Sequence, residues 1–215
     1  MKLLPILSAF ILITTVSSAQ KEFEGEIHYL HLFHFRQTGI DSMQVIKDFG
    51  SSSKYFYKNG SYKWTFETSE LQTEYYLAEK AKVYDKEVHN DSIFLNPFDS
   101  EDTLLRYEIK LNVDTICGYP CDMIRVLIAK KEHPDYVMMR FIYFSNQLHL
   151  NPEKFKSYTT YCNNEVFELT HAIPLRIEMD VPAWPFTMRF EAIKVIRREV
   201  TAEEIMIPKN VPVKE

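Results

Sequence analysis

The sequence has little of what enzymes and multidomain proteins usually contain. It has five glycines and three cysteines in 215 residues. It has no phosphate-binding loop, no Gly-x-Ser-x-Gly turn and no Ser/His/Asp motif. No Pro/Gly/Ser linker, low-complexity tract or repeat of fixed period divides it. We therefore expect no catalytic residue, no cofactor, and a single domain over residues 20–215.

Long apolar runs are also scarce, and the one present lies at the N-terminus and ends near Val16. It is shorter than the ~20 residues that cross a bilayer. Small residues at Ser17 and Ala19 suit a signal-peptidase site. We expect residues 1–19 to be a signal peptide cleaved before Gln20, and a periplasmic or secreted mature chain without a transmembrane segment. An uncleaved anchor helix is the alternative.

Basic residues are fewer than acidic residues. Without the lysine of the predicted signal peptide, 24 basic residues face 30 acidic ones, a formal net charge of −6. The nearest approach to a basic patch is Lys194 with Arg197 and Arg198, separated by apolar residues on a predicted strand. Phosphate binding needs clustered cations. We therefore expect no nucleic-acid partner.

The histidines do not predict a metal site. His28, His31 and His34 are three residues apart in a segment that reads as strand. There, His28 and His34 share a face, but six residues of strand span ~20 Å, which is too far for one metal ion. Surface or edge histidines are the simpler interpretation.

Most of the chain has the pattern of antiparallel β structure. Asn59-Gly60 supplies the two positive-φ residues of a type I′ turn between arms that alternate aromatic side chains. A second hairpin is expected around residues 79–81, and other turns must use asparagine, aspartate and proline because glycine is scarce. Further strands are expected in FEGEIHYLHLFHF, LLRYEIKLNVDTI, DMIRVLIAKK, DYVMMRFIYFS, EVFEL, IPLRIEMDV and FTMRFEAIKVIRREV.

One interior helix is predicted over residues 151–162, NPEKFKSYTTYC. Asn151 suits the N-cap and Pro152 the first helical position. Phe155 and Tyr158 recur at helical spacing and would bury one face. The pattern predicts a mainly β, α+β fold in which antiparallel strands wrap around one helix.

Two cysteines, Cys117 and Cys121, lie in DTICGYPCDMI between two predicted strands. Cysteines of exported proteins tend to form disulfides. A three-residue loop would place these two cysteines opposite each other at disulfide distance. A redox centre needs Cys-x-x-Cys at a helix N-terminus, and a structural zinc site needs four ligands. We expect a Cys117–Cys121 disulfide that fixes the turn. Thiol–disulfide chemistry at this pair, and a bridge from Cys162 to either cysteine, are the alternatives.

Aromatic residues form 14% of the chain, more than one-face alternation requires. The segment VMMRFIYF, residues 137–144, is apolar on both faces except at Arg140. Such a strand is either enclosed in a core or lines an apolar cavity that also holds the helix. The segment DVPAWPF resembles a loop that places an aromatic side chain at a rim. The residues that we expect to bind a ligand are Phe141, Tyr143, Phe155, Tyr158, Trp184 and Phe186.

Several segments together resemble a known family. They are FEGEIHY, DTICGYPCDMIRV, FSNQLHLNPEKF, IPLRIEM and IMIPKN. They are similar to exported bacterial proteins related to the LolA-type lipoprotein carriers, in particular an uncharacterised branch with an Ile-x-Gly-Tyr-x-Cys turn. Ile116, Gly118, Tyr119 and Cys121 match that turn. The resemblance implies a strongly curved antiparallel half-barrel around a helical plug, with an apolar cavity.

Two functions follow as expectations. The first is an exported protein that binds a lipid or other hydrophobic ligand on the concave face of the half-barrel. The second is a non-enzymatic envelope scaffold with a filled core, whose sheet face or edge takes a protein partner. Whether the face of the helix that carries Phe155 and Tyr158 leaves a cavity separates the two.

Overall fold

The structure is a computed structural model that describes residues 21–96, 102–130 and 133–214. The predicted signal peptide, residues 1–19, lies outside the described residues. Within them the fold is mainly β, as the sequence predicted. The twelve strands are β1 (Gly25–Phe35), β2 (Ser52–Lys58), β3 (Ser61–Phe66), β4 (Leu71–Leu77), β5 (Lys82–Glu87), β6 (Ile93–Asn96), β7 (Asp102–Ile116), β8 (Tyr119–Lys130), β9 (His133–His149), β10 (Ala172–Asp180), β11 (Phe186–Arg197) and β12 (Val213–Lys214).

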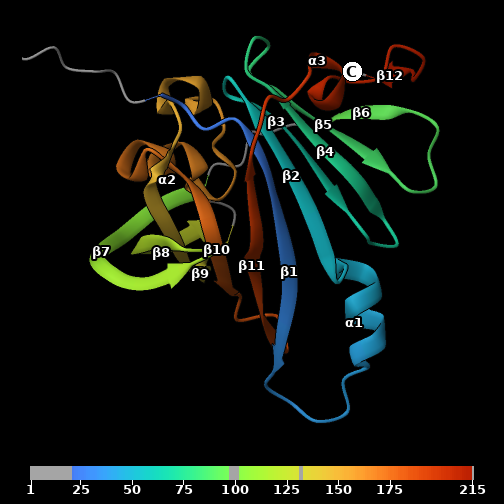
Figure 1. Ribbon diagram of the computed structural model, residues 1–215. Helices are drawn as coiled ribbons and strands as arrows, with labels where there is room; N and C mark the ends of the chain where they lie inside the picture. The colour runs from blue at the N-terminus through green and yellow to red at the C-terminus, as the bar shows by residue number, and fades with distance from the viewer. Residues whose placement is uncertain (1–20, 97–101, 131–132, 215) are drawn as a thin grey trace, which may run out of the picture.

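All twelve strands form one sheet in the order β12-β6-β5-β4-β3-β2-β1-β11-β10-β9-β8-β7. Neighbouring strands are antiparallel except β12 and β6, which are parallel. The sheet does not close, because β7 and β12 lie at its two ends. β1 and β11 form its middle, so the first and last long strands are neighbours although 150 residues lie between them in the chain. Figure 1 shows β7–β10 to one side of this central pair and β2–β6 to the other.

Two hairpins confirm the sequence prediction. Tyr57 pairs with Tyr62 across the turn at Asn59-Gly60, whose φ values are 50° and 82°. Both turn residues therefore have the positive φ of a type I′ turn, which matches the twist of the strands. The second hairpin joins β4 to β5, with Ala81 at φ 52°.

The helical elements are shorter and more numerous than the sequence predicted. Figure 1 shows α1 and α3 at opposite ends of the strands. These elements are α1 (Ser42–Phe49), the 3-10 helices η1 (Pro152–Phe155) and η2 (Thr160–Cys162), α2 (Asn163–Thr170) and α3 (Ala202–Ile205). We call η1, η2 and α2 together, residues 152–170, the helical segment.

The prediction of one helix over residues 151–162 was wrong. Asn151 does cap a helix, since its side chain accepts a hydrogen bond from the Glu153 backbone N–H, but η1 ends after one turn. Tyr161 and Cys162 both have φ near 55°, and this kink redirects the chain.

The prediction of a strand in EVFEL was also wrong, because these residues belong to α2. Val166, Phe167 and Thr170 are buried along one side of that helix. A five-residue apolar run does not by itself distinguish a strand from a short buried helix.

Helix α1 has no counterpart in the sequence prediction. The Asp41 side chain accepts from the backbone N–H groups of Met43 and Gln44, and Gly50 ends the helix at φ 76°. A capping aspartate and a terminal glycine eight residues beyond the helix start were the available signal. Val45 and Phe49 pack against the core without being fully buried.

The geometry expected at the cysteine turn was wrong. The loop between β7 and β8 has two residues rather than three, because Ile116 pairs with Tyr119. Cys117 therefore occupies the first turn position, and Cys121 lies opposite Asp114. In the described chain all three cysteines are free thiols, so no disulfide is present.

The core lies between one face of the sheet and the helical segment. We call this the inner face; on β1 it carries Ile27 and Tyr29, both buried. Phe155 of η1 packs against Tyr76 of β4 at 4.9 Å between ring centroids and against Phe167 of α2 at 4.7 Å. The helical segment is therefore fixed to the sheet by a stack of aromatic rings, worth roughly 1 kcal/mol per pair beyond area burial.

Candidate ligand-binding site

A cavity of about 60 Å³ lies between the inner face and the helical segment. We call it the inner cavity. It is bounded by five strands, namely β1, β2, β3, β9 and β10, and by residues of the helical segment. Its lining is Tyr29, Tyr55, Tyr62, Trp64, Arg140, Ile142, Tyr158, Asn163, Val166, Phe167, Ile173, Pro174 and Ile177.

One wall of the inner cavity is aromatic. The Trp64 ring lies 5.6 Å from the Tyr55 ring and 5.9 Å from the Tyr29 ring. The Tyr29 hydroxyl donates to the Pro174 carbonyl oxygen at 2.6 Å, which ties β1 to β10 across the cavity. β9, β10 and α2 contribute the aliphatic side chains of Ile142, Ile173, Ile177 and Val166 to the lining. Such a lining suits an apolar ligand with few polar contacts.

Arg140 introduces a positive charge into this apolar site. Residues alternate along β9, so that Met138, Arg140 and Ile142 all face inward and are buried. The Arg140 side chain donates from Nη1 to the Tyr161 carbonyl oxygen at 2.8 Å and to Asn163 Oδ1 at 3.0 Å. Both acceptors are neutral. Burial lowers the pKa of the Arg140 guanidinium, although arginine stays charged in proteins.

Two N–H donors at the inner cavity have no hydrogen-bond partner. They are Arg140 Nε and Trp64 Nε1, and both atoms are buried. A buried donor left unsatisfied costs about 1–3 kcal/mol, and more when the group is charged. Native proteins seldom keep such groups without a function or a bound molecule. Two residues that line the cavity therefore each retain an unused N–H donor.

A tyrosine–carboxyl network adjoins the cavity. The Tyr62 hydroxyl lies 2.9 Å from the Tyr158 hydroxyl and 2.5 Å from a carboxyl oxygen of Glu74. Glu74 faces Asp85 across β4 and β5. Burial, followed by the charge of Asp85, raises the pKa of Glu74 to about 7, and burial raises the pKa of Asp85 to about 6. Near neutral pH these two carboxyl groups are therefore protonated to a greater extent than ordinary carboxyl groups.

The six residues predicted to bind a ligand lie in three different places. Tyr158 lines the inner cavity, and Phe155 is buried beside it against Tyr76. Trp184 and Phe186 belong to an aromatic cluster with Phe49 of α1, at ring distances of 5.2 and 5.4 Å.

The other two predicted residues, Phe141 and Tyr143, point to the opposite, outer face of β9, because they alternate with Arg140 and Ile142. The Tyr143 ring is covered there by the Arg176 guanidinium, at 4.6 Å from the centroid. The structure therefore brings only Tyr158 and its neighbour Phe155 to the inner cavity.

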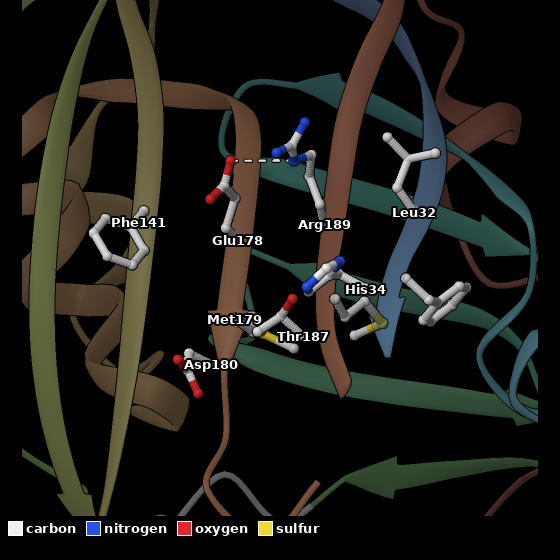
Figure 2. Close-up of a pocket in the computed structure, with 10 residues that line it drawn as sticks. Leu32, His34, Phe141, Glu178, Met179, Asp180, Thr187 and Arg189 are labelled. Atoms are coloured by element: carbon white, nitrogen blue, oxygen red, sulfur yellow. Dashed lines mark ion pairs between the residues drawn. The ribbon is translucent and has the colours of Figure 1, made fainter. Parts of the chain in front are cut away.

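Phe141 lines a second hollow, on the outer face of β1, β11, β10 and β9, shown in Figure 2. This outer groove has a volume of about 280 Å³ and contains both signs of charge. Arg189 Nε contacts Glu178 Oε1 at 3.1 Å, the ion pair dashed in Figure 2. Asp180 pairs with Arg36. Because these charges are already paired within the protein, the outer groove does not need a charged ligand to neutralise them.

The described histidines and cysteines are not arranged as a metal site, and the thiols are not activated. Among the described residues no group of three or more His, Cys, Asp or Glu side chains is placed to hold a metal ion. His31 is buried, with its ring 2.8 Å from Ser53 Oγ, so the expectation of a surface histidine was wrong there. Burial raises the pKa values of Cys117 and Cys121, the direction opposite to the one a nucleophilic thiol needs.

No known protein-family model matches the sequence, and comparison with curated proteins finds no match. None of the helices in the described part of the chain is long and apolar enough to cross a membrane.

Proposed function

We propose that this is an exported, non-enzymatic protein that binds an amphiphilic or hydrophobic ligand between the inner face of the sheet and the helical segment. The observation that carries the proposal is the inner cavity, whose apolar lining contains two unpartnered N–H donors. A filled structural core would leave neither space nor unused donors. The LolA-like resemblance supports the same arrangement, with the sheet as a half-barrel and the helical segment as its plug.

The size of the cavity limits what it can hold. At about 60 Å³ it is less than half of the roughly 150 Å³ that holds benzene in an engineered apolar cavity. It accommodates the polar end of an amphiphile and its first carbons. A longer chain requires the helical segment to separate from the sheet.

Mass spectrometry of the mature protein, purified from the envelope of its native host, tests this function. Under native conditions we expect a mass excess that disappears on denaturation, and extraction then identifies the ligand. An unliganded mass that does not shift when lipid extract is added would contradict the proposal. The same spectra locate the mature N-terminus, which we propose to be Gln20.

A specific observation favours an interaction function as the second candidate. The edge strand β7 exposes Leu105, Tyr107, Ile109, Leu111 and Val113, each between 39% and 68%. Within the described residues β7 pairs only with β8. The unpaired backbone groups of a long, apolar edge strand of this kind can hydrogen-bond to a strand of another chain.

The occupant that fits this edge is a second copy of the chain. Residues 106–110 form the regular part of β7, between register irregularities after Leu104 and after Lys110. An antiparallel pair centred on Ile109 of both copies places Glu108 of each copy opposite Lys110 of the other. Opposite charges face each other twice in this register, and opposed charge pairs stabilise a sheet by roughly 0.2–1 kcal/mol each.

Light scattering after gel filtration tests the second candidate. We expect a dimer that dissociates on dilution, and a monomer for Ile109→Lys. Ile193→Lys is the matched control, since Ile193 is 59% exposed on β11 in the middle of the sheet. A parent protein that is monomeric at every concentration would exclude this interface.

A further inference from the structure

We propose that the ligand of the inner cavity is a monoanionic carboxylate amphiphile, whose head group accepts hydrogen bonds from Arg140 and Trp64. This inference rests on the proposed ligand-binding function and adds the chemical class of the ligand. It is carried by contacts of the described residues at the base of the cavity.

Arg140 is buried without an ion-pair partner among the described residues. The side chain is 4% exposed. Burial lowers the pKa of Arg140, and the charge of Asp102, which accepts from the Tyr161 backbone N–H, opposes this shift without contacting Arg140 in an ion pair. Its two hydrogen-bond acceptors are a backbone carbonyl and an asparagine amide oxygen. Buried charges in proteins are normally paired, because an isolated ion loses its hydration without compensation. An anion in the cavity supplies the missing charge.

The two free N–H donors belong to residues that line the same cavity. Arg140 lines the cavity with its Nη1 already engaged and its Nε without a partner. Trp64 lines the same cavity with Nε1 also free. A carboxylate has two oxygens that accept from separate donors, and it matches guanidinium geometry better than any neutral acceptor does.

The single charge of Arg140 limits the charge of the ligand. One guanidinium balances one negative charge. A phosphate monoester, with a charge near −2, would leave an excess negative charge beside the network that contains Glu74. The cavity volume of about 60 Å³ also favours the smaller head group.

The remaining lining is complementary to the alkyl part of such a ligand. Ile142, Val166, Phe167, Ile173 and Ile177 line the cavity without offering a side-chain polar atom. The carbons next to the carboxylate would contact these side chains, and their transfer out of water would favour binding. A polar ligand without an alkyl part would lack this hydrophobic contribution to binding.

Arg140 also has a structural contact that a test must separate from ligand binding. Its guanidinium lies 5.6 Å from the Tyr161 ring centroid and donates to the Tyr161 carbonyl oxygen, at the kink of the helical segment. Replacing Arg140 can therefore disturb the kink. The test accordingly compares two ligands on each variant rather than one ligand across variants.

The experiment uses a Trp184→Phe protein, in which Trp64 is the only tryptophan of the chain. Emission from Trp64 is followed during titration with octanoate and, separately, with octanol, which has the same chain length and no charge. We expect octanoate to bind at least about ten-fold more tightly than octanol, and Arg140→Gln to abolish this preference while octanol binding persists. Arg189→Gln in the outer groove is the matched control and keeps the preference.

Trp64→Phe removes the Nε1 donor, keeps an aromatic ring at this position and leaves the hydrogen bonds of Arg140 to Tyr161 and Asn163 in place. Measured by calorimetry in otherwise unaltered protein, it should weaken octanoate several-fold and octanol little. Equal affinities of the parent for the two ligands, or a preference that survives Arg140→Gln, would overturn the carboxylate inference and leave the proposed function intact. Failure of both ligands to bind would instead contradict the proposed function.

Discussion

At the scale of single residues, the facing carboxyl groups of Glu74 and Asp85 couple the stability of the fold to pH. Burial holds their pKa values near 7 and 6, above their ordinary values of 4.5 and 3.8. Between the ordinary and the raised values, the folded protein binds more protons than the unfolded chain. The free energy of unfolding contributed by this pair therefore falls as the pH rises through that window.

The Glu74→Gln variant isolates this effect. Between about pH 5 and about pH 8 we expect the parent to lose roughly 2 kcal/mol of stability relative to the variant, because glutamine needs no ionisation. Urea unfolding at the two pH values measures this difference. His31, whose pKa is lowered by burial, changes stability in the opposite direction but equally in both proteins, so it cancels. A difference that does not change with pH would contradict the raised pKa of Glu74.

The residues of the site could be predicted from the sequence only in part. Tyr158 was predicted as a ligand contact because its helical spacing from Phe155 indicated a buried face. Arg140 was visible as the one polar residue in residues 137–144, but that segment is apolar on both faces. Which face points inward depends on the pairing of β9 with β8 and β10, which no local pattern specifies. Trp64 could not be assigned to the site for the same reason.

At the scale of elements, the chain contains two tight hairpin turns with the same geometry and different residues. Asn59-Gly60 has φ values of 50° and 82°, and Cys117-Gly118 has the same two values. Asparagine tolerates the left-handed conformation better than cysteine does, because its side chain bonds to the local backbone. The second turn therefore carries strain that the first does not.

Replacing Cys117 by asparagine should stabilise the protein. We expect a gain of roughly 0.5 kcal/mol in the free energy of unfolding, reduced by loss of the contact between Cys117 Sγ and the Ala192 carbonyl oxygen at 3.1 Å. Thermal or urea unfolding under reducing conditions measures the change. The reciprocal variant, Asn59→Cys, should lose a similar amount. Destabilisation by Cys117→Asn would show that the sulfur contact outweighs the turn strain.

The elements themselves show why hairpins were predicted and the short helices were not. A type I′ turn has a two-residue signature, so Asn59-Gly60 located β2 and β3 correctly. Helix α1 does carry apolar residues at helical spacing, since Val45 and Phe49 both pack against the core, but eight residues are too few for this periodicity to identify a helix by itself. The helical segment was misassigned because its kink at Tyr161 and Cys162 is held by tertiary contacts, including Arg140 with the Tyr161 carbonyl oxygen.

At the scale of the whole molecule, the helical segment connects the β7 end of the open sheet to β3 and β4, on the other side of the central strands. Its Phe155 and Tyr158 pack against β3 and β4 through Tyr62 and Tyr76. On the other side, the Tyr161 backbone N–H donates to Asp102 of β7 at 2.8 Å. The segment is therefore the element that must move if the inner cavity is to enlarge, and its positive-φ kink is where it deforms most readily.

Ligand length should therefore decide whether the helical segment moves. Butanoate fits a cavity of about 60 Å³ far better than dodecanoate does. We expect butanoate to leave amide hydrogen exchange in residues 156–163 unchanged or slower, and dodecanoate to accelerate it by about ten-fold, because the long chain displaces the segment. Peptides from β1 provide the internal control, since that strand is paired on both sides and should not respond to either ligand. Slower exchange in residues 156–163 with dodecanoate would mean that a long chain is accommodated with the segment in place, and that the cavity enlarges through side-chain movements instead.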